Sequence, residues 1–170
     1  MAFVRAKVVE GYTYYQLVHN YREAGKHRQK VLCHLGKHSS LDKAVEDKRR
    51  EEEELRDKAV GLFDITTEHK ETILDRYGEM VGREVPSSNK AAAMNEDGWE
   101  SFKEAERGYP FDHPESRKRW HVARDTYQLF KDVRKYESMR WKALWYDDRA
   151  NKAQEKKGKL MEVKEKYPHL

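Results

Sequence analysis

The chain has 170 residues, of which 39% are charged and 37% are hydrophobic, and its mean hydropathy is -1.13. Such a polar composition excludes one large compact core, so we expect a small folded domain joined to long, largely solvated helices. Aromatic residues make up 11% of the chain, and this share excludes full disorder because disordered chains are poor in aromatics.

The net charge of +4 is unevenly distributed along the chain. Residues 1–40 carry a net charge of +5, residues 41–112 carry −8, and residues 113–170 carry +7. Two basic ends favour an anionic partner such as nucleic acid. The acidic middle is typical of solvated helix faces.

A single cysteine, Cys33, excludes an internal disulfide framework and fits a reducing compartment. The N-terminus does not follow the pattern of a signal peptide, because Arg5 and Lys7 introduce charge at once. No apolar run approaches the roughly 20 residues that span a bilayer. We therefore expect a cytoplasmic protein without a membrane partner.

Three β-prone segments open the chain, at residues 3–9, 13–22 and 26–35. Glu10-Gly11 and Ala24-Gly25 separate them, and glycine supplies the positive φ that tight hairpin turns require. The pattern predicts a three-stranded antiparallel sheet.

Strict alternation along the strands predicts which side chains share a face of this sheet. The inner face, packed under the following helix, is expected to hold Tyr15, Leu17, Val31, Cys33 and Leu35. The outer face is then expected to hold Tyr14, Gln16, Arg28 and Lys30. A slip of one residue in register would exchange the two sets.

Helical patterns follow the sheet. Ser39 is expected to cap a helix whose apolar residues between 41 and 45 cover the inner sheet face. We expect this helix to end near Asp64, and a second helix to begin at Thr66 and run to residue 81. The segment 85–89 is the clearest linker.

A shorter helix is predicted at about residues 96–107, and two prolines exclude a continuous helix just after it. A long helix follows from Glu115, with Gly158 and Pro168 as the next helix breakers. Its aromatic residues recur at helical spacing, and basic residues lie between them.

The predicted fold class is α+β, with a small three-stranded antiparallel sheet plus helix at the N-terminus and an extended, mainly α-helical region after it. We expect three parts: a β-ribbon and helix head at residues 1–47, an acidic helical segment at 48–85, and a helical region with an aromatic and basic long helix at 86–170.

The basic β-ribbon indicates nucleic-acid binding. A ribbon fits the major groove, about 12 Å wide, where Arg and Lys contact guanine edges or phosphates and Gln suits adenine. Aromatic residues on the C-terminal helix are suited to stacking on nucleobases, although the same spacing also suits a helical core. The candidate contacts are Tyr14, Gln16, Arg22, Lys26, Arg28, Lys30, Lys37, Arg117, Arg119, Arg134, Arg140, Trp141 and Trp145. Duplex DNA is the first expected partner, and RNA is the second.

Residues 11–36 carry a set of spaced identities: Tyr14-Tyr15, Leu17-Val18, Tyr21-Arg22, Gly25-Lys26, Arg28-Gln29, Leu32 and Leu35-Gly36. Through these, residues 5–46 resemble the N-terminal segment of bacterial insertion-sequence transposases of the DDE class. The order of strands and helix is also similar to the arm-binding domains of tyrosine recombinases, whose three-stranded sheet lies in the DNA major groove. The resemblance implies that this segment binds DNA.

The same family places this segment before an RNase-H-like domain that carries three catalytic carboxylates. After residue 46 the present chain offers only helical patterns and too little length for such a domain. We therefore expect no enzymatic activity, and predict a nucleic-acid-binding accessory protein of mobile-element, phage or plasmid type. Two alternatives remain: an adaptor or inhibitor that docks a larger enzyme through its helices, and an RNA-binding subunit of a ribonucleoprotein.

Other chemistry has weak support in the sequence. Cys33, His34 and His38 are close together, but adjacent strand residues point to opposite faces and no fourth residue has zinc-like spacing. Acidic runs such as residues 51–54 diverge into water on a helix and do not converge in a pocket. We expect no metal, no cofactor and no catalytic residue.

Overall fold

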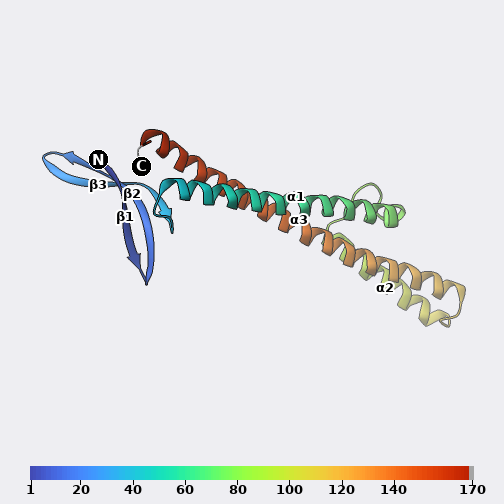
Figure 1. The fold of residues 1–170 in the computed structure, drawn as a ribbon. Coiled ribbons are helices and arrows are strands. Elements are labelled where there is room, and N and C mark those ends of the chain that lie inside the picture. Colours follow the sequence, from blue (N-terminus) through green and yellow to red (C-terminus); the bar gives the residue numbers. More distant parts are fainter. Residues whose placement is uncertain (169–170) are drawn as a thin grey trace. The chain divides into compact units, whose positions relative to one another are not determined.

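The computed structural model describes residues 1–168 and places a three-stranded antiparallel sheet before three helices (Figure 1). The strand order in the sheet is β1-β2-β3. The elements are β1 (Ala2–Val9), β2 (Tyr12–Glu23), β3 (Lys26–Gly36), α1 (Leu41–Val81), α2 (Ser88–Gly108) and α3 (Pro114–Lys166). The predicted α+β class, with the sheet at the N-terminus and helices after it, is confirmed.

Both predicted hairpin turns are present. Glu10 and Gly11 have φ values of 52° and 81°, and Ala24 and Gly25 have φ values of 47° and 77°. Two successive residues with positive φ are the mark of a type I′ turn, whose twist matches that of the flanking strands. Glycine at the second position makes each turn accessible, because it adopts positive φ without steric cost.

The contacts within the chain define two compact units. Unit 1 combines residues 1–58 with the chain from Tyr146 onward, and unit 2 comprises residues 59–145. Unit 1 thus holds the sheet, the start of α1 and the end of α3, whereas unit 2 holds α2 and the remaining parts of the two long helices. The expected division at residues 47 and 85 stays a prediction.

In unit 1 the sheet packs on helical residues from both ends of the chain. The buried cluster consists of Leu35 from β3, Leu41 and Ala44 from α1, and Leu160 from α3. The predicted apolar stripe at the start of α1 is therefore confirmed as a cover for the sheet. The contribution of α3 was not predicted, since no local pattern links Leu160 to a strand.

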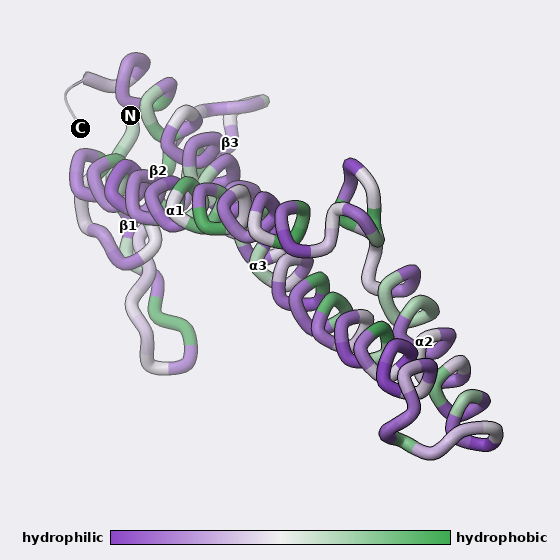
Figure 2. The backbone as a smooth tube through the Cα atoms, turned by 90° about the vertical axis from the view of Figure 1, so that its right-hand side faces the viewer, coloured by the Kyte–Doolittle hydropathy of each residue, from purple (hydrophilic) through white to green (hydrophobic). Residues whose placement is uncertain are grey.

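Unit 2 is organised around a second core. Ile73 and Tyr77 of α1, Ala91 of α2, and Leu129 and Val133 of α3 form one buried cluster. Three helices thus contribute to a single apolar seam, while hydrophilic residues dominate the rest of the tube (Figure 2).

The predicted break in the first helix is wrong, because α1 is continuous from Leu41 to Val81. Thr66 and Thr67 do not cap a new helix: their hydroxyls donate to the carbonyls of Leu62 and Phe63, four residues earlier. Threonine within a helix satisfies its hydroxyl in this way without ending the helix.

The start of α1 and the bounds of the later helices also differ in detail from the prediction. Ser40, not Ser39, caps α1, because its Oγ accepts from the backbone N–H of Lys43 at 3.3 Å. The helix α2 begins at Ser88 and not near residue 96, since Ser87 caps it and alanines follow. Gly158 does not break α3; one glycine costs a helix only about 1 kcal/mol.

Candidate nucleic-acid interface

Two β-ribbon arms extend from the sheet. Residues 15–19 of β2 pair with both neighbouring strands, and Asn20 also exchanges backbone hydrogen bonds with Met1. Residues 12–14 pair only with β1, and residues 21–23 pair only with β3. The β1–β2 arm (residues 7–14) and the β2–β3 arm (residues 20–29) therefore continue as two-stranded ribbons, and they point in different directions (Figure 1).

Two irregularities in β3 decide which side chains share a face. The partner of Leu17 is Cys33, but the partner of Val18 is Val31, so Leu32 is an extra residue in β3. A second shift between the partners of Tyr15 and Gln16 leaves Leu35 without a partner in the ladder. Each bulge changes the alternation of the strand by one residue.

The sheet has a helix face and an open face. On the helix face, Val4, Tyr15 and Cys33 pack against the buried cluster of α1 and α3. Directly opposed residues lie on the same side of a sheet, so the register also assigns Arg28 and Lys30 to the helix face through Tyr21 and His19.

The open face comprises the alternate residues of the three strands. Gln16 pairs with His34, and Val18 pairs with Val31. The remaining members on the arms and in the centre are Phe3, Arg5, Lys7, Val9, Tyr12, Tyr14, Asn20, Arg22, His27 and Gln29.

The predicted outer face of the sheet is therefore wrong as a set. Tyr14 and Gln16 lie on the open face, whereas Arg28 and Lys30 follow the alternation of the helix face. Val31, predicted to be packed under the helix, is 40% exposed on the open face. The cause is the bulge at Leu32, which strict alternation does not anticipate.

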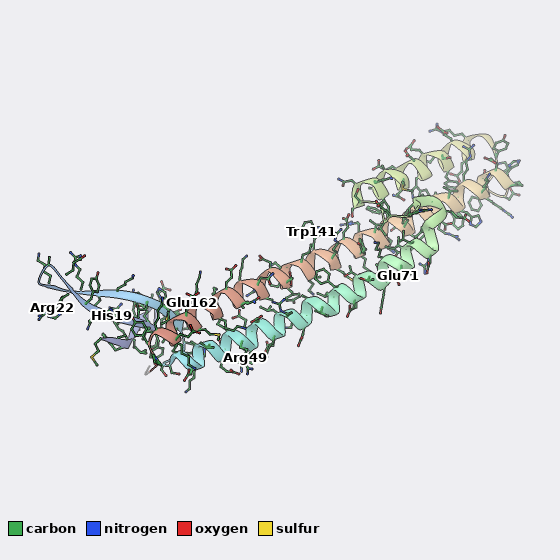
Figure 3. All side chains as sticks on the ribbon, turned by 90° about the horizontal axis from the view of Figure 1, so that it is seen from above. His19, Arg22, Arg49, Glu71, Trp141 and Glu162 are labelled. Carbon is green, nitrogen blue, oxygen red and sulfur yellow. The ribbon has the colours of Figure 1, made fainter. Side chains whose placement is uncertain are left out.

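Cations gather on the β2–β3 arm and at its base. Lys26 and Lys30 are exposed, and neither has a hydrogen-bond or ion-pair partner among residues 1–168. Arg28 Nε lies 2.8 Å from Glu23 Oε2, so this carboxylate neutralises part of the helix side of the arm. Arg22 projects from the arm (Figure 3), and its Nε donates to His27 Nε2 at 3.2 Å.

A row of polar side chains crosses the open face from strand to strand. Arg5 on β1 donates to Gln29 Oε1 at 2.9 Å and to Gln16 Oε1 at 2.8 Å. The amide nitrogen of Gln16 lies 3.2 Å from His34 Nδ1. Gln16 is buried, so contact between its amide and a base edge would require both of these bonds to be exchanged.

The β1–β2 arm has a different surface. Val8 and Tyr12 are 68% and 69% exposed, and Val9 and Tyr14 are also exposed. Hydrophobic residues mark this hairpin in Figure 2. Lys7 is the only cation of this arm, and Glu10 lies at its turn. The positive charge of the sheet is therefore concentrated on the β2–β3 arm.

Lys37 lies beside a cavity of about 780 Å³ formed by the end of β3, the start of α1 and the end of α3. Its Nζ is 3.6 Å from Asp47 Oδ1, and His38 Nε2 is 3.2 Å from the other carboxylate oxygen. Burial raises the pKa of the Cys33 thiol in the cavity wall, which disfavours the thiolate.

The candidates on α3 belong to unit 2, where several engage other residues of that unit. Arg119 donates to Glu115 Oε1 at 2.9 Å and to the carbonyl of Ser101 at 3.3 Å. The guanidinium of Arg134 lies 5.6 Å from the ring centroid of Phe130. Arg117, Arg140, Trp141 and Trp145 are exposed, and Trp141 projects from the helix (Figure 3).

Within unit 1 the candidates do not share one surface. Tyr14 and Gln16, the cations of the β2–β3 arm, and Lys37 lie on different parts of unit 1, and the α3 candidates belong to unit 2. Sequence reasoning missed Arg5, Asn20 and Gln29, which share the open face with Arg22. Their polar character was visible in the sequence, but their common face depends on the bulge.

The described chain has neither a metal-binding cluster nor a membrane-spanning helix. Residues 1–168 contain no group of three or more His, Cys, Asp or Glu side chains placed to hold a metal ion. None of the helices within this range has the length and apolar character needed to cross a membrane.

Residues 4–61 match the family model for the N-terminal domain of IS1634 family transposases. The match spans nearly all of the sheet and the first half of α1, which is about a third of the chain. It confirms the resemblance to insertion-sequence transposases and extends it beyond residue 46. No curated protein and no solved structure gives a significant match.

Proposed function

We propose that unit 1 binds duplex DNA through its sheet, as part of a mobile-element protein. The observation that carries this proposal is the unpaired positive charge of Lys26 on the β2–β3 arm and of Lys30 at its base. The transposase N-terminal match of residues 4–61 supports the same assignment, because transposases act on DNA.

The two-stranded form of the arm suits the proposed ligand. A two-stranded ribbon enters the major groove of B-DNA, which is about 12 Å wide. Lysines on such a ribbon neutralise phosphates at the groove walls and release condensed counterions. Arg22, Lys26, Arg28 and Lys30 contact phosphates or bases in this arrangement.

Salt-titrated binding of the full chain to duplex DNA tests the proposal. The double variant Arg28→Ala/Lys30→Ala should weaken binding, and it should reduce the slope of log K against log salt by about 2, near one unit for each lost phosphate contact. A matched variant, Lys58→Ala/Arg83→Ala, removes the same charge from exposed positions outside the sheet and should leave the slope unchanged.

Parallel titrations with duplex RNA and with single strands identify the preferred nucleic acid. The proposal requires duplex DNA to bind most tightly at matched salt. Absence of binding to any duplex DNA would contradict the proposal. Equal slopes of log K against log salt for the two double variants would contradict it too.

We further propose that the 170-residue chain acts without catalysis, as an accessory DNA-binding factor. All regular elements after the sheet are helices in the described chain, whereas the RNase-H-like domain of the resembling transposases carries its carboxylates on strands and a helix. Incubation of the chain with bound duplex DNA and Mg²⁺ or Mn²⁺ should leave both strands intact. Cleavage that scales with protein concentration and survives further purification would contradict this role.

A further inference from the structure

We propose that Arg22, Asn20 and Gln29 on the open face of the β2–β3 arm read base edges in the major groove, and that His27 and Arg5 position them. This inference rests on the proposed DNA binding and adds which face of the sheet approaches the bases. The substrate class is a specific duplex sequence that contains guanine and adenine at fixed spacing.

The helices decide which face can approach DNA. Tyr15 and Cys33 on the helix face pack against Leu41 and Leu160, so α1 and α3 cover that side of the sheet centre. At the base of the arm, the ring of His19 lies 6.1 Å from that of Tyr167, which follows α3. A duplex that docks with its groove floor against this face would collide with the helices, whereas Asn20, Arg22 and Gln29 on the open face of the arm are exposed.

The two faces also differ in chemistry. The open face holds no carboxylate, because Glu10 lies in a turn and Glu23 pairs with Lys26 on the helix face. The open face of the arm instead carries the amides of Asn20 and Gln29, which are directly opposed across the two strands. Amides hydrogen-bond adenine and guanidinium groups hydrogen-bond guanine, each in a bidentate manner.

Neighbouring residues orient two of the three readers. Arg22 Nε and Nη2 lie 3.2 Å and 3.1 Å from His27 Nε2, so this contact fixes the plane of the guanidinium and leaves Nη1 uncommitted. Arg5 Nη1 donates to Gln29 Oε1 at 2.9 Å, which directs the amide NH₂ of Gln29 away from Arg5. Planar groups held in this way lose less rotational freedom on binding.

The spacing of the readers matches that of stacked base pairs. Asn20 and Arg22 lie two residues apart on one strand, a distance of about 7 Å along the ribbon. This distance corresponds to about two base-pair steps, since the rise along a strand of B-DNA is about 3.4 Å. Lys26 and Lys30 on the other face reach the phosphate walls beside the ribbon through their flexible side chains.

Selection of bound duplexes from a randomised library by the full chain tests this assignment. The wild-type protein should enrich a motif with guanine and adenine about two positions apart. Arg22→Ala should lose about 5- to 150-fold discrimination at the guanine position only, and Asn20→Ala/Gln29→Ala should lose the same range at the adenine position.

Two further variants separate reading from positioning and from phosphate contact. His27→Ala should weaken the guanine preference alone, with unchanged thermal unfolding, because His27 is exposed on the arm. Lys26→Ala/Lys30→Ala should lower affinity for all sequences equally and preserve the motif.

The outcomes distinguish the two proposals. Binding to duplex DNA without any motif, or a motif unchanged by Arg22→Ala and by Asn20→Ala/Gln29→Ala, would overturn the reading assignment and leave the proposed function standing. Absence of binding to any duplex would overturn the proposed function itself.

Discussion

The β2–β3 arm and the α3 helix of unit 2 both combine cations with aromatic residues, but the two regions use them differently. In unit 2, the guanidinium of Arg124 lies 5.3 Å from the ring centroid of Trp120, and that of Arg134 lies 5.6 Å from Phe130. Such contacts stabilise a helix surface and occupy the faces of the rings.

On the β2–β3 arm and at its base, two cations have no polar partner among the described residues. Lys26 and Lys30 have no polar partner within the described chain, and Arg28 has one carboxylate, Glu23. Arg124 and Arg134 of unit 2 are thus engaged with aromatic rings, whereas the two lysines have no polar partner within residues 1–168. Arg117 and Arg140 of unit 2 are exposed and also have no polar side-chain partner in the described chain, so local pairing distinguishes individual cations and not whole regions.

Charge reversal gives the largest expected contrast between the two regions. Lys26→Glu/Lys30→Glu should lower affinity for duplex DNA by roughly 100-fold at low salt, because attraction to phosphates becomes repulsion. Lys131→Glu/Arg134→Glu makes the same change in unit 2 and should alter affinity less than threefold in the same fluorescence anisotropy titration. Equal losses for the two variants would show that unit 2 also contacts DNA.

Aromatic truncation sharpens the contrast within unit 2. Trp120 lies edge-on to Phe111 at a centroid distance of 6.3 Å and beneath Arg124, so Trp120→Ala should cost about 2 kcal/mol in the free energy of unfolding. Trp141 is 71% exposed, and Trp141→Ala should cost less than about 0.5 kcal/mol. Urea denaturation followed by circular dichroism measures both. A similar cost for the two variants would mean that Trp141 is buried in the protein in solution.

Glycine positions in unit 2 give an effect of intermediate size. A Cβ at Gly98 would lie 2.6 Å from Thr126 Oγ1 and 3.2 Å from Ala123 Cα, so Gly98→Ala should destabilise unit 2 by about 1 kcal/mol or more after the gain in helix propensity. A Cβ at Gly61 meets nothing within 4 Å, and Gly61→Ala should stabilise by up to about 1 kcal/mol. Thermal unfolding should therefore shift in opposite directions. Shifts in the same direction would contradict the close approach of α2 to α3.

Acid sensitivity of unit 1 is the smallest expected effect. The hydrogen bond from Lys157 Nζ to Glu52, at 2.5 Å, holds the pKa of this carboxyl below its ordinary value. A lowered pKa in the folded state adds stability above the ordinary value of about 4.3, and this stability is lost as the pH falls through the folded pKa. Glu52→Gln should therefore flatten the decline in stability below about pH 4.3, whereas Glu155→Gln on α3 should not. The free energy of unfolding, measured between neutral pH and pH 3, compares the two variants. Equal slopes of this free energy against pH would show that Glu52 does not cause the acid sensitivity.

Local chemistry was enough to predict much of the fold. The turns at Glu10-Gly11 and Ala24-Gly25, the three strands and the apolar start of α1 all follow from neighbouring residues. Helix bounds were less predictable, because Thr66 and Gly158 carry ambiguous local signals and are retained within long helices. At both positions the weak local preference to start or end a helix is overridden by the hydrogen bonds and packing of the surrounding helix.

The composition of the candidate interface was visible in the sequence, but its geometry was not. Arg22, Lys26 and Lys30 were identified from their charge and their place around a hairpin turn. The shared face of Arg22 with Asn20 and Gln29 escaped prediction, because it depends on where the register of β3 shifts.

Turns, strand alternation and helix periodicity are local properties, so the order of residues alone predicts that a basic hairpin follows a first strand and that helices follow the sheet. Which face of that hairpin is open depends on packing between distant parts of the chain. Leu35 lies without a ladder partner in β3 and is buried with Leu41 and Leu160. Packing between residues distant in the chain therefore accompanies the bulges, and each bulge reverses the side to which all following residues point.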